Sequence, residues 1–314
     1  MRPSISRNEL AWLATLDDVE SRIVFTERAG EQTRYRVEPG PFDSAFLQAL
    51  PRRDWTLLVH DVDKHLPAMR RLFAQVPFIP DWRIDDLMIS FAAPGGGVGP
   101  HRDNYDVFLC QGIGRREWHF STDNIKEDPT ASDDLALLEA FSGGERRLAR
   151  KGDVLYLPPG VAHRGTAQRA CLTYSIGMRA PSFYADPDLR LSEVRPGYIS
   201  PDARRRAGVD AASLGCIVTE LKQWLRPDSP CDQDIAGMLA APKALRLHGM
   251  TRIAFDDETV YINGEARPLA EADRGPVASL CEHRGLDRAT AARLDEHVLR
   301  WLLAQGAFEQ DDQD

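Results

Sequence analysis

The chain has 314 residues, of which 43% are hydrophobic and 28% charged, a composition that excludes a mainly disordered or fibrous protein and predicts two or three folded units. Its formal net charge of −9 argues against direct nucleic-acid binding, because affinity for phosphate needs clustered Lys and Arg. The N-terminus lacks the apolar core of a secretory signal, no apolar run predicts a membrane span, and the five scattered cysteines contain no CxxC pair. We therefore expect a cytoplasmic protein.

The N-terminal part predicts an α/β flank. Apolar residues recur every three or four positions from Arg7 to Phe25, which predicts an amphipathic helix with a strand near its end. The apolar run Trp55–Val59 is typical of a strand, and a second helix is expected over Ala68–Val76.

The central region predicts an antiparallel sandwich or jelly roll. From Trp82 onward, short apolar runs alternate with Gly and Pro turns, a pattern typical of that architecture. The pattern of short apolar runs and turns ends after Arg179-Ala180-Pro181, so we expect a first domain to span residues 1–181. Strands are predicted over Asp86–Ala92, Asp106–Cys110, Glu117–Ser121, Asp153–Leu157 and Cys171–Gly177.

Two further parts are expected after residue 181. Residues 182–248 predict a helical connector, and residues 249–314 a strand-and-helix mixture that resembles a winged helix. Residues 250–314 carry seven Arg, no Lys and fourteen Asp plus Glu, so insertion into a DNA groove is disfavoured. The elements predicted here are a helix over Ala211–Leu225, a hairpin of Arg252–Phe255 and Thr259–Ile262 with the turn Asn263-Gly264, and helices around Gly275–His283 and Thr290–Gln305.

An H-x-D triplet predicts two metal ligands. His101 and Asp103 lie two residues apart in a segment expected to be extended, so their side chains point to the same face. A third candidate is His163, which follows a predicted strand and a Pro-Pro-Gly turn. Two His and one carboxylate form the facial triad of non-heme Fe(II) oxygenases, which leaves positions open for a co-substrate and dioxygen. The rival third ligand is His119, inside a predicted strand.

Two other features flank this triplet. The glycine-rich segment Pro94–Pro100 lacks the Lys and helix of a phosphate-binding loop. It permits either a close approach of chain or substrate backbone to the metal, or simply a turn. Further on, Arg115 and Arg116 enter a predicted strand; a buried arginine could bind a carboxylate through two parallel hydrogen bonds, whereas a solvated pair would have no such role.

The central part of the sequence, where matching motifs are most frequent, resembles the bacterial ribosomal oxygenases, JmjC-type enzymes of the cupin superfamily. These hydroxylate C3 of an arginine in large-subunit ribosomal protein sixteen. The resemblance covers about residues 82–181. It is carried by Trp82–Ser90, Pro94–His101, Asp103, Tyr105–Phe108, Gln111-Gly112, Gly114–Trp118, Gly152-Asp153, Tyr156–Gly160, His163, Tyr174-Ser175 and Arg179–Pro181.

The resemblance implies a double-stranded β-helix and a role for each candidate residue. His101, Asp103 and His163 would hold Fe(II), and Arg116 would bind the distal carboxylate of 2-oxoglutarate, with dioxygen as the second co-substrate. The arginine pocket of the family would be built here by Asp86, Met88, Tyr105 and Ser175. A guanidinium fits a carboxylate, an aromatic face and an apolar wall, although Met88 could equally belong to the core and Tyr105 to strand pairing.

The expected partner is a basic ribosomal protein of the large subunit, as substrate. A homodimer is possible, but the stretch from Ser182 to Leu245, where the family has its dimerisation helices, is shorter here. Two alternatives stay open. The same triad could hydroxylate a histidine of another ribosomal protein, although Asp86 favours arginine, or the chain could be a metal-binding cupin without turnover.

Overall fold

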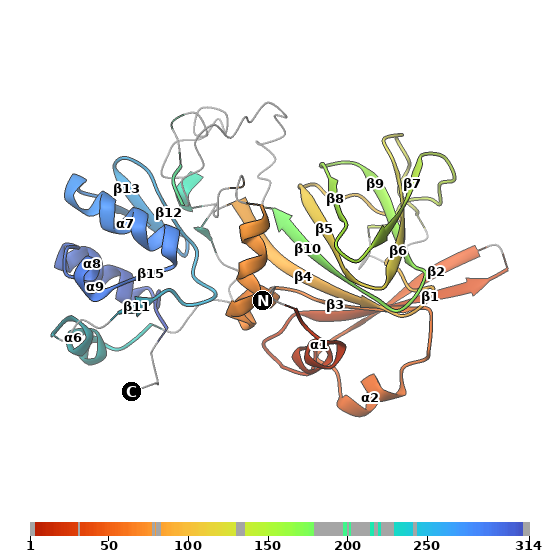
Figure 1. Cartoon of the computed structure of the whole chain (residues 1–314), viewed down its shortest axis with the longest axis horizontal. Coiled ribbons are helices and arrows are strands. Elements are labelled where there is room, and N and C mark those ends of the chain that lie inside the picture. The colour runs from red at the N-terminus through yellow and green to blue at the C-terminus, as the bar shows by residue number, and fades with distance from the viewer. Residues whose placement is uncertain are drawn as a thin grey trace. The chain divides into compact units, whose positions relative to one another are not determined.

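The computed structural model divides into two compact units (Figure 1), one of residues 1–73 and 85–180 and one of residues 74–84 and 181–314. The residues it describes are 4–30, 32–76, 79, 83–129, 136–178, 197–199, 201, 214–216, 219–220, 229–240 and 244–309. Trp82, the boundary at Arg179–Pro181, and most of the predicted connector and of its helix lie outside them. The three-part division therefore stays a prediction.

Antiparallel sheets dominate the first unit, which confirms the mostly β, jelly-roll fold. Within the described residues, one sheet has seven strands in the order β2-β1-β3-β4-β10-β5-β8, and the other has three in the order β7-β6-β9. The strands are β1 (Ser21–Ala29), β2 (Gln32–Pro39), β3 (Trp55–Val59), β4 (Ile84–Ala92), β5 (Val107–Ile113), β6 (Arg115–Ser121), β7 (Glu145–Arg150), β8 (Val154–Leu157), β9 (Ala162–Ala167) and β10 (Cys171–Met178).

The two sheets enclose a common core. Val107 and Leu109 of β5 and Leu157 of β8 form one buried cluster with Trp118 of β6 and Ala149 of β7. In β6, β9 and β10, every second residue faces this interior, because side chains alternate along a strand. Functional side chains on those faces are therefore held by strands on both sides.

All seven predicted strands of this unit are present, but β2, β7 and β9 were not predicted. In β7, only Ala149 is buried among the residues of Glu145–Arg150, so the strand has no apolar alternation that a sequence reading could detect. β2 is likewise mostly exposed along its length.

The predicted first helix is shorter than expected. Helix α1 spans Arg7–Leu13 and begins with a reciprocal capping box between Ser6 and Glu9. The apolar spacing continues to Ile23, but that residue already lies in β1. The predicted second helix is a 3-10 helix, η1 (Pro67–Gln75). Short helices α2 (Ser44–Ala49) and α3 (Val62–His65) follow β2 and β3 respectively.

The second unit combines short sheets and helices. The Asn263-Gly264 turn has two positive φ angles, 51° and 89°, as a type I′ turn requires. It joins β13 to β14, a strand that was not predicted, and does not join β12 to β13. The elements are α6 (Asp232–Ala240), β11 (Leu245–Arg246), β12 (Ile253–Phe255), β13 (Thr259–Ile262), β14 (Glu265–Pro268), α7 (Glu271–His283), β15 (Gly285–Leu286), α8 (Arg288–Ala291) and α9 (Glu296–Ala304).

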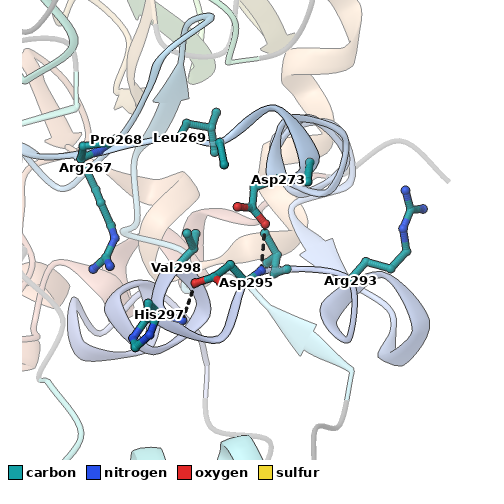
Figure 2. A pocket seen from close by; sticks show the side chains of 11 residues that line it. Arg267, Pro268, Leu269, Asp273, Arg293, Asp295, His297 and Val298 are labelled. Carbon is teal, nitrogen blue, oxygen red and sulfur yellow. Dashed lines mark hydrogen bonds between the residues drawn. The ribbon is translucent and has the colours of Figure 1, made fainter.

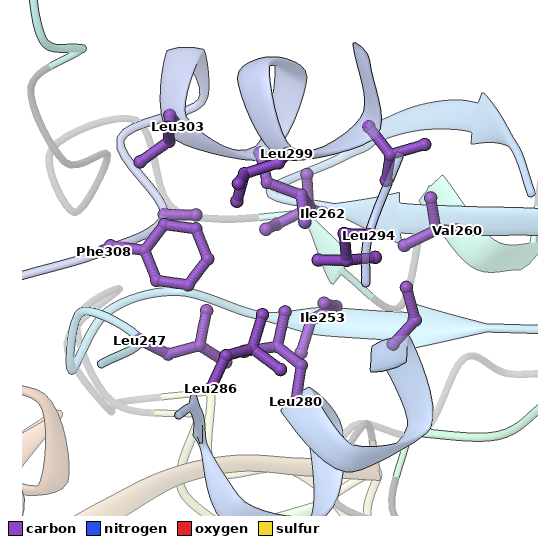
Figure 3. Packing of buried hydrophobic residues seen from close by; sticks show 14 of the residues in the cluster. Leu247, Ile253, Val260, Ile262, Leu280, Leu286, Leu294, Leu299, Leu303 and Phe308 are labelled. Atoms are coloured by element: carbon purple, nitrogen blue, oxygen red, sulfur yellow. The ribbon is translucent and has the colours of Figure 1, made fainter. Parts of the chain in front are cut away.

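An apolar core of its own holds the second unit together (Figure 3). Ile253, Val260 and Ile262 of the small sheet pack with Leu280 of α7 and Leu299 of α9. The winged-helix assignment of residues 249–314 stays a prediction. Among the helices of the described residues, none has both the length and the apolar character needed to cross a membrane.

Candidate active site

The backbone brings the two candidate histidines side by side. His101 and His163 form an isolated antiparallel bridge, with N–H···O distances of 3.0 and 2.9 Å between their peptide groups. The turn before His163 is tied to the H-x-D triplet, because the N–H of Gly160 donates to the carbonyl of Asp103 at 2.9 Å. Gly160 has a φ of +80°, a conformation that favours glycine.

The three side chains converge as a metal site would require. Nε2 of His163 lies 3.6 Å and Nε2 of His101 3.9 Å from the Asp103 carboxylate. One ligand atom from each residue lies within 4.8 Å of the others, and this is the only such group of His, Cys, Asp or Glu in the described residues. Two imidazoles and a carboxylate suit Fe(II).

Hydrogen bonds orient both imidazoles. Nδ1 of His101 lies 3.1 Å from the carbonyl of Gly99, and Nδ1 of His163 lies 3.0 Å from that of Val161. Because a carbonyl only accepts, each Nδ1 must carry a proton, which leaves Nε2 with a lone pair for a metal. Burial and the neighbouring His101 lower the pKa of His163 to about 4, so His163 is neutral at neutral pH.

His119 does not join this group. It lies on β6, where Phe120 and not His119 is opposite His163. Its Nε2 donates to the carbonyl of Gly143 at 2.6 Å, and its ring contacts that of Phe141 at a tilt of 43°. The geometry therefore gives no support to the rival assignment of His119 as the third ligand.

Arg116 is buried with free donors. Its side chain is 5% exposed, and its Nη1 lies 3.4 Å from the hydroxyl of Ser90. Nε and Nη2 are buried without any hydrogen-bond partner. Buried charged donors are costly unless they are paired, so the site fits a bound anion. A dicarboxylate such as 2-oxoglutarate would supply a carboxylate for this planar pair of donors.

The position of Arg116 on β6 relates it to the three converging side chains. Arg116, Trp118 and Phe120 share one face of β6, and His163 lies opposite Phe120 on the same face. The rings of Trp118 and His163 are 6.1 Å apart. Trp118 has room because Gly165 has no side chain, and a Cβ there would lie 2.6 Å from its ring.

β4 carries two of the candidate residues, Asp86 and Met88, in one row with Ser90. Asp86, Met88 and Ser90 are alternate residues and point to the same face, so Asp86 and Ser90 lie about 13 Å apart. Met88 is half-buried between them. Ser175, also buried, and Gly177 are alternate residues of β10, and a Cβ on Gly177 would lie 2.9 Å from Oδ1 of Asp86.

Tyr105 joins the acidic end of this row to the metal-binding group. Its ring lies 3.8 Å from the position of a Cβ on Gly177, the same position that Asp86 approaches. Its hydroxyl donates a hydrogen bond to Asp103, and burial together with the negative charges of Asp103 and Asp86 raises the pKa of Tyr105. Tyr105 is 40% exposed, so part of this residue is accessible to an incoming group.

Two contacts of the site were missed in the sequence. His60 follows β3, and its Nδ1 lies 3.4 Å from the Asp86 carboxylate. Ser90 contacts Arg116. Strand alternation from Asp86 would have indicated Ser90, whereas His60 approaches through the pairing of β3 with β4, which the sequence does not specify.

The second unit has a cavity of about 800 Å³ between β14, α7 and α9 (Figure 2). Its acidic side chains are engaged in structural hydrogen bonds: Asp273 accepts the N–H of Asp295, and Asp295 accepts that of His297, both at 2.8 Å. No metal-binding group occurs among the described residues that line it. All the candidate site residues lie in the first unit.

A jelly roll in which two imidazoles and a carboxylate converge, and in which a buried arginine with unpaired donors lies on the strand next to β9, defines a class, the non-heme iron oxygenases that use 2-oxoglutarate. A JmjC domain model matches residues 71–185. The chain is 33% identical to the ribosomal protein uL16 3-hydroxylase of Escherichia coli, over 90% of this chain and 84% of that protein. It is 35% identical to a probable ribosomal oxygenase of Haemophilus influenzae, over 58% of this chain and 47% of the relative.

The structure is similar to that of the E. coli ribosomal oxygenase YcfD in complex with cobalt and 2-oxoglutarate. The TM-score is 0.73 at 30% identity, and the match covers 97% of this chain and 90% of that one. The chain belongs to the JmjC-type ribosomal oxygenases. It is an Fe(II)- and 2-oxoglutarate-dependent oxygenase, and the predicted class, fold and cofactors are confirmed.

Proposed function

We propose that this enzyme hydroxylates C3 of an arginine in a large-subunit ribosomal protein, of which uL16 is the first candidate, in the cytoplasm. His101, Asp103 and His163 would hold Fe(II), and Arg116 the distal carboxylate of 2-oxoglutarate. Iron and 2-oxoglutarate together supply the oxidising chemistry, in which one oxygen atom of O₂ enters the substrate C–H bond and the other enters succinate, with loss of CO₂.

One observation carries the choice of arginine. A carboxylate, Asp86, and an aromatic ring, Tyr105, both approach Gly177, and the Tyr105 hydroxyl is hydrogen-bonded to the metal-ligand candidate Asp103. A guanidinium could pair with Asp86 and stack on Tyr105, while its aliphatic stem lies toward the metal. Met88 and Ser175 would complete the walls of this pocket.

The chain's own residues account for the orientation of both substrates. Nδ1 of each histidine is bound by a carbonyl, which presents Nε2 to the metal. The row from Ser90 to Asp86 on β4 separates the carboxylate end of 2-oxoglutarate, near Arg116, from the guanidinium end of the substrate. The target C–H bond would lie between them, and fixed orientation of this kind lowers the activation barrier.

Peptide substitution tests the choice of arginine over histidine. The enzyme should hydroxylate a uL16 peptide that contains the target arginine, and should fail on the same peptide with Lys or His at that position, because neither reproduces the planar guanidinium fork. Asp86→Ala should abolish peptide hydroxylation while binding of 2-oxoglutarate remains. Efficient turnover of the histidine peptide would favour the alternative histidine hydroxylase and contradict the proposal.

A further inference from the structure

The end of β3 leaves part of β4 without a strand partner on one side. The register of β3 with β4 ends at the pair Val59 and Ile89, while β4 itself begins at Ile84. After β3 the chain turns away at Asp61, whose φ of 54° and ψ of 27° are left-handed, and enters α3. Continued pairing would have matched residue 61 with Leu87.

Side chains of α3 take over where the strand stops. The N–H of Leu87 donates to Oδ1 of Asp63 at 2.9 Å, and Nζ of Lys64 donates to the carbonyl of Asp85 at 3.0 Å. Both backbone groups lie on the same edge of β4, because residues 85 and 87 are alternate residues. Asp63 and Lys64 therefore provide the hydrogen bonds that a longer β3 would have provided.

These side chains belong to a buried cluster with balanced charge. Lys64 forms an ion pair with Asp61 and lies 3.5 Å from Asp63, while Arg70 donates to the second oxygen of Asp63 at 3.2 Å. The side chains of Asp61, Asp63 and Lys64 are only 2–3% exposed. A buried ion cluster with directional partners has one favourable geometry and holds its contacts rigidly.

Asp86 lies between the two backbone groups that this cluster holds. We infer that Asp63 and Lys64 are positioning residues, which fix Asp86 for binding of the substrate guanidinium by clamping the peptide groups on either side of it. The inference rests on the proposed function, in which Asp86 binds the target arginine. His60 is a further contact of the same carboxylate, at 3.4 Å.

Asp63 and Lys64 should affect binding of the protein substrate and not binding of 2-oxoglutarate. Ser90, which contacts Arg116, lies beyond Ile89, where β3 and β4 are paired in register. Loosening the start of β4 should therefore displace Asp86 while Ser90 and Arg116 stay in place. A displacement of about 1 Å in a group that orients a substrate can cost up to a hundredfold in rate.

The test is steady-state kinetics of the full-length, iron-loaded enzyme with a uL16 peptide containing the target arginine. Asp63→Ala should raise KM for the peptide about tenfold or more, with KM for 2-oxoglutarate unchanged. Asp63→Asn keeps an oxygen acceptor for the N–H of Leu87 and should restore the peptide KM to within about threefold of wild type. Hydrogen exchange at Leu87 should accelerate in the alanine variant and not in the asparagine variant.

Leu13→Ala is the matched control for lost stability. Leu13 is buried in α1, so its truncation should destabilise the protein while leaving the peptide KM unchanged. If Asp63→Ala does not fold, Arg70→Gln decides the question. It removes one donor to Asp63 from a side chain that is 20% exposed, and should raise the peptide KM about threefold.

An unchanged peptide KM in Asp63→Ala, or in Arg70→Gln when the first variant does not fold, would overturn the inference. So would an equal rise of both KM values, which would indicate general loosening of the fold. These outcomes are separable from failure of the proposed function. If the wild type does not hydroxylate the arginine peptide at all, the proposed function fails. If wild-type activity is lost in Asp86→Ala but unchanged in Asp63→Ala, only the positioning role is removed.

Discussion

Strand alternation decides which residues of β6 can serve the site. Arg116 and His119 are three positions apart, so they must point to opposite faces of the strand. Once Arg116 is buried on the inner face, His119 cannot be a ligand of the same centre, and its contacts with Gly143 and Phe141 are those of a structural residue. This alternation could be read from the sequence, and it also places Arg116, Trp118 and Phe120 on one face of the strand.

Metal binding should depend on the three converging residues. Because each would supply one ligand to an open coordination sphere, His101→Ala, Asp103→Ala and His163→Ala should each abolish turnover and weaken Fe(II) binding by about tenfold or more. Calorimetric titration with a redox-stable divalent ion such as Co²⁺ checks this without turnover. His119→Ala is the control and should retain metal binding; loss of binding there, with retention in His163→Ala, would refute the ligand set.

Removal of the Arg116 guanidinium should affect one co-substrate. The lost charge-assisted pair is worth roughly 1.5–3 kcal/mol, so Arg116→Ala should weaken 2-oxoglutarate about tenfold to a hundredfold. Metal affinity should remain, since Arg116 contacts Ser90 and Trp118 and none of the candidate ligands. Arg115→Ala is the neighbouring control, because that residue is exposed. An unchanged dissociation constant for 2-oxoglutarate in Arg116→Ala would mean that another basic residue holds the carboxylate.

The metal-free enzyme should lose stability in mildly acidic solution. The pKa of His163 is about 4 in the folded chain and 6.5 in the reference state. As the pH falls from about 6.5 to about 4, the unfolded chain takes up a proton that the folded chain does not, and stability decreases by up to roughly 3 kcal/mol. Urea unfolding of the metal-free protein across this range measures the effect. His163→Gln should flatten the profile; the same slope in that variant would assign it to other groups.

At the scale of elements, strands with apolar runs were predictable, and strands without them were not. Trp55–Val59 is wholly buried and was predicted with its correct bounds, whereas the charged residues of β7 and the exposed residues of β2 give no periodic signal. In the second unit, the Asn263-Gly264 turn was recognised but assigned to the wrong pair of strands, because a type I′ turn identifies a hairpin without naming both partners.

The glycine-rich segment Pro94–Pro100 forms turns, which is one of the two suggested uses, whereas a close approach to the metal stays a prediction. Gly95 and Gly99 have φ angles of +82° and +86°, as turns require. Gly96 and Gly97 instead allow close backbone approach, since a Cβ on Gly97 would lie 2.5 Å from the carbonyl oxygen of Gly165. The sequence indicated a special backbone here but could not indicate the partner, which lies on β9.

Gly97→Ala should therefore destabilise the first unit. The clash is with backbone, which cannot rotate away, and overpacking of this kind costs about 1–3 kcal/mol. Because Gly165 follows His163 closely on β9, metal affinity should fall as well. Gly143→Ala is the control, since its Cβ would lie 3.7 Å from Asp123. Equal midpoints of urea unfolding for the two variants would show that the loop accommodates a side chain.

For the whole molecule, the sequence was most informative where chemistry requires particular residues. The class, the jelly roll and the convergence of His101, Asp103 and His163 followed from motif and resemblance, and each is seen in the fold or supported by its relatives. The positioning cluster behind Asp86 could not be predicted, because Asp63 and Lys64 act through backbone groups far along the chain. A homodimer and the absence of direct nucleic-acid binding stay predictions.

We expect the enzyme to oxidise an arginine of a ribosomal protein at the site of His101, Asp103 and His163. The most direct measurement is tandem mass spectrometry of uL16 after incubation with the enzyme, Fe(II), 2-oxoglutarate and dioxygen. A mass gain of about 16 Da, one oxygen atom, should appear on a single arginine, should require 2-oxoglutarate, and should vanish with Asp103→Ala. A gain on a histidine, or no gain while the enzyme still binds 2-oxoglutarate and metal, would contradict the account.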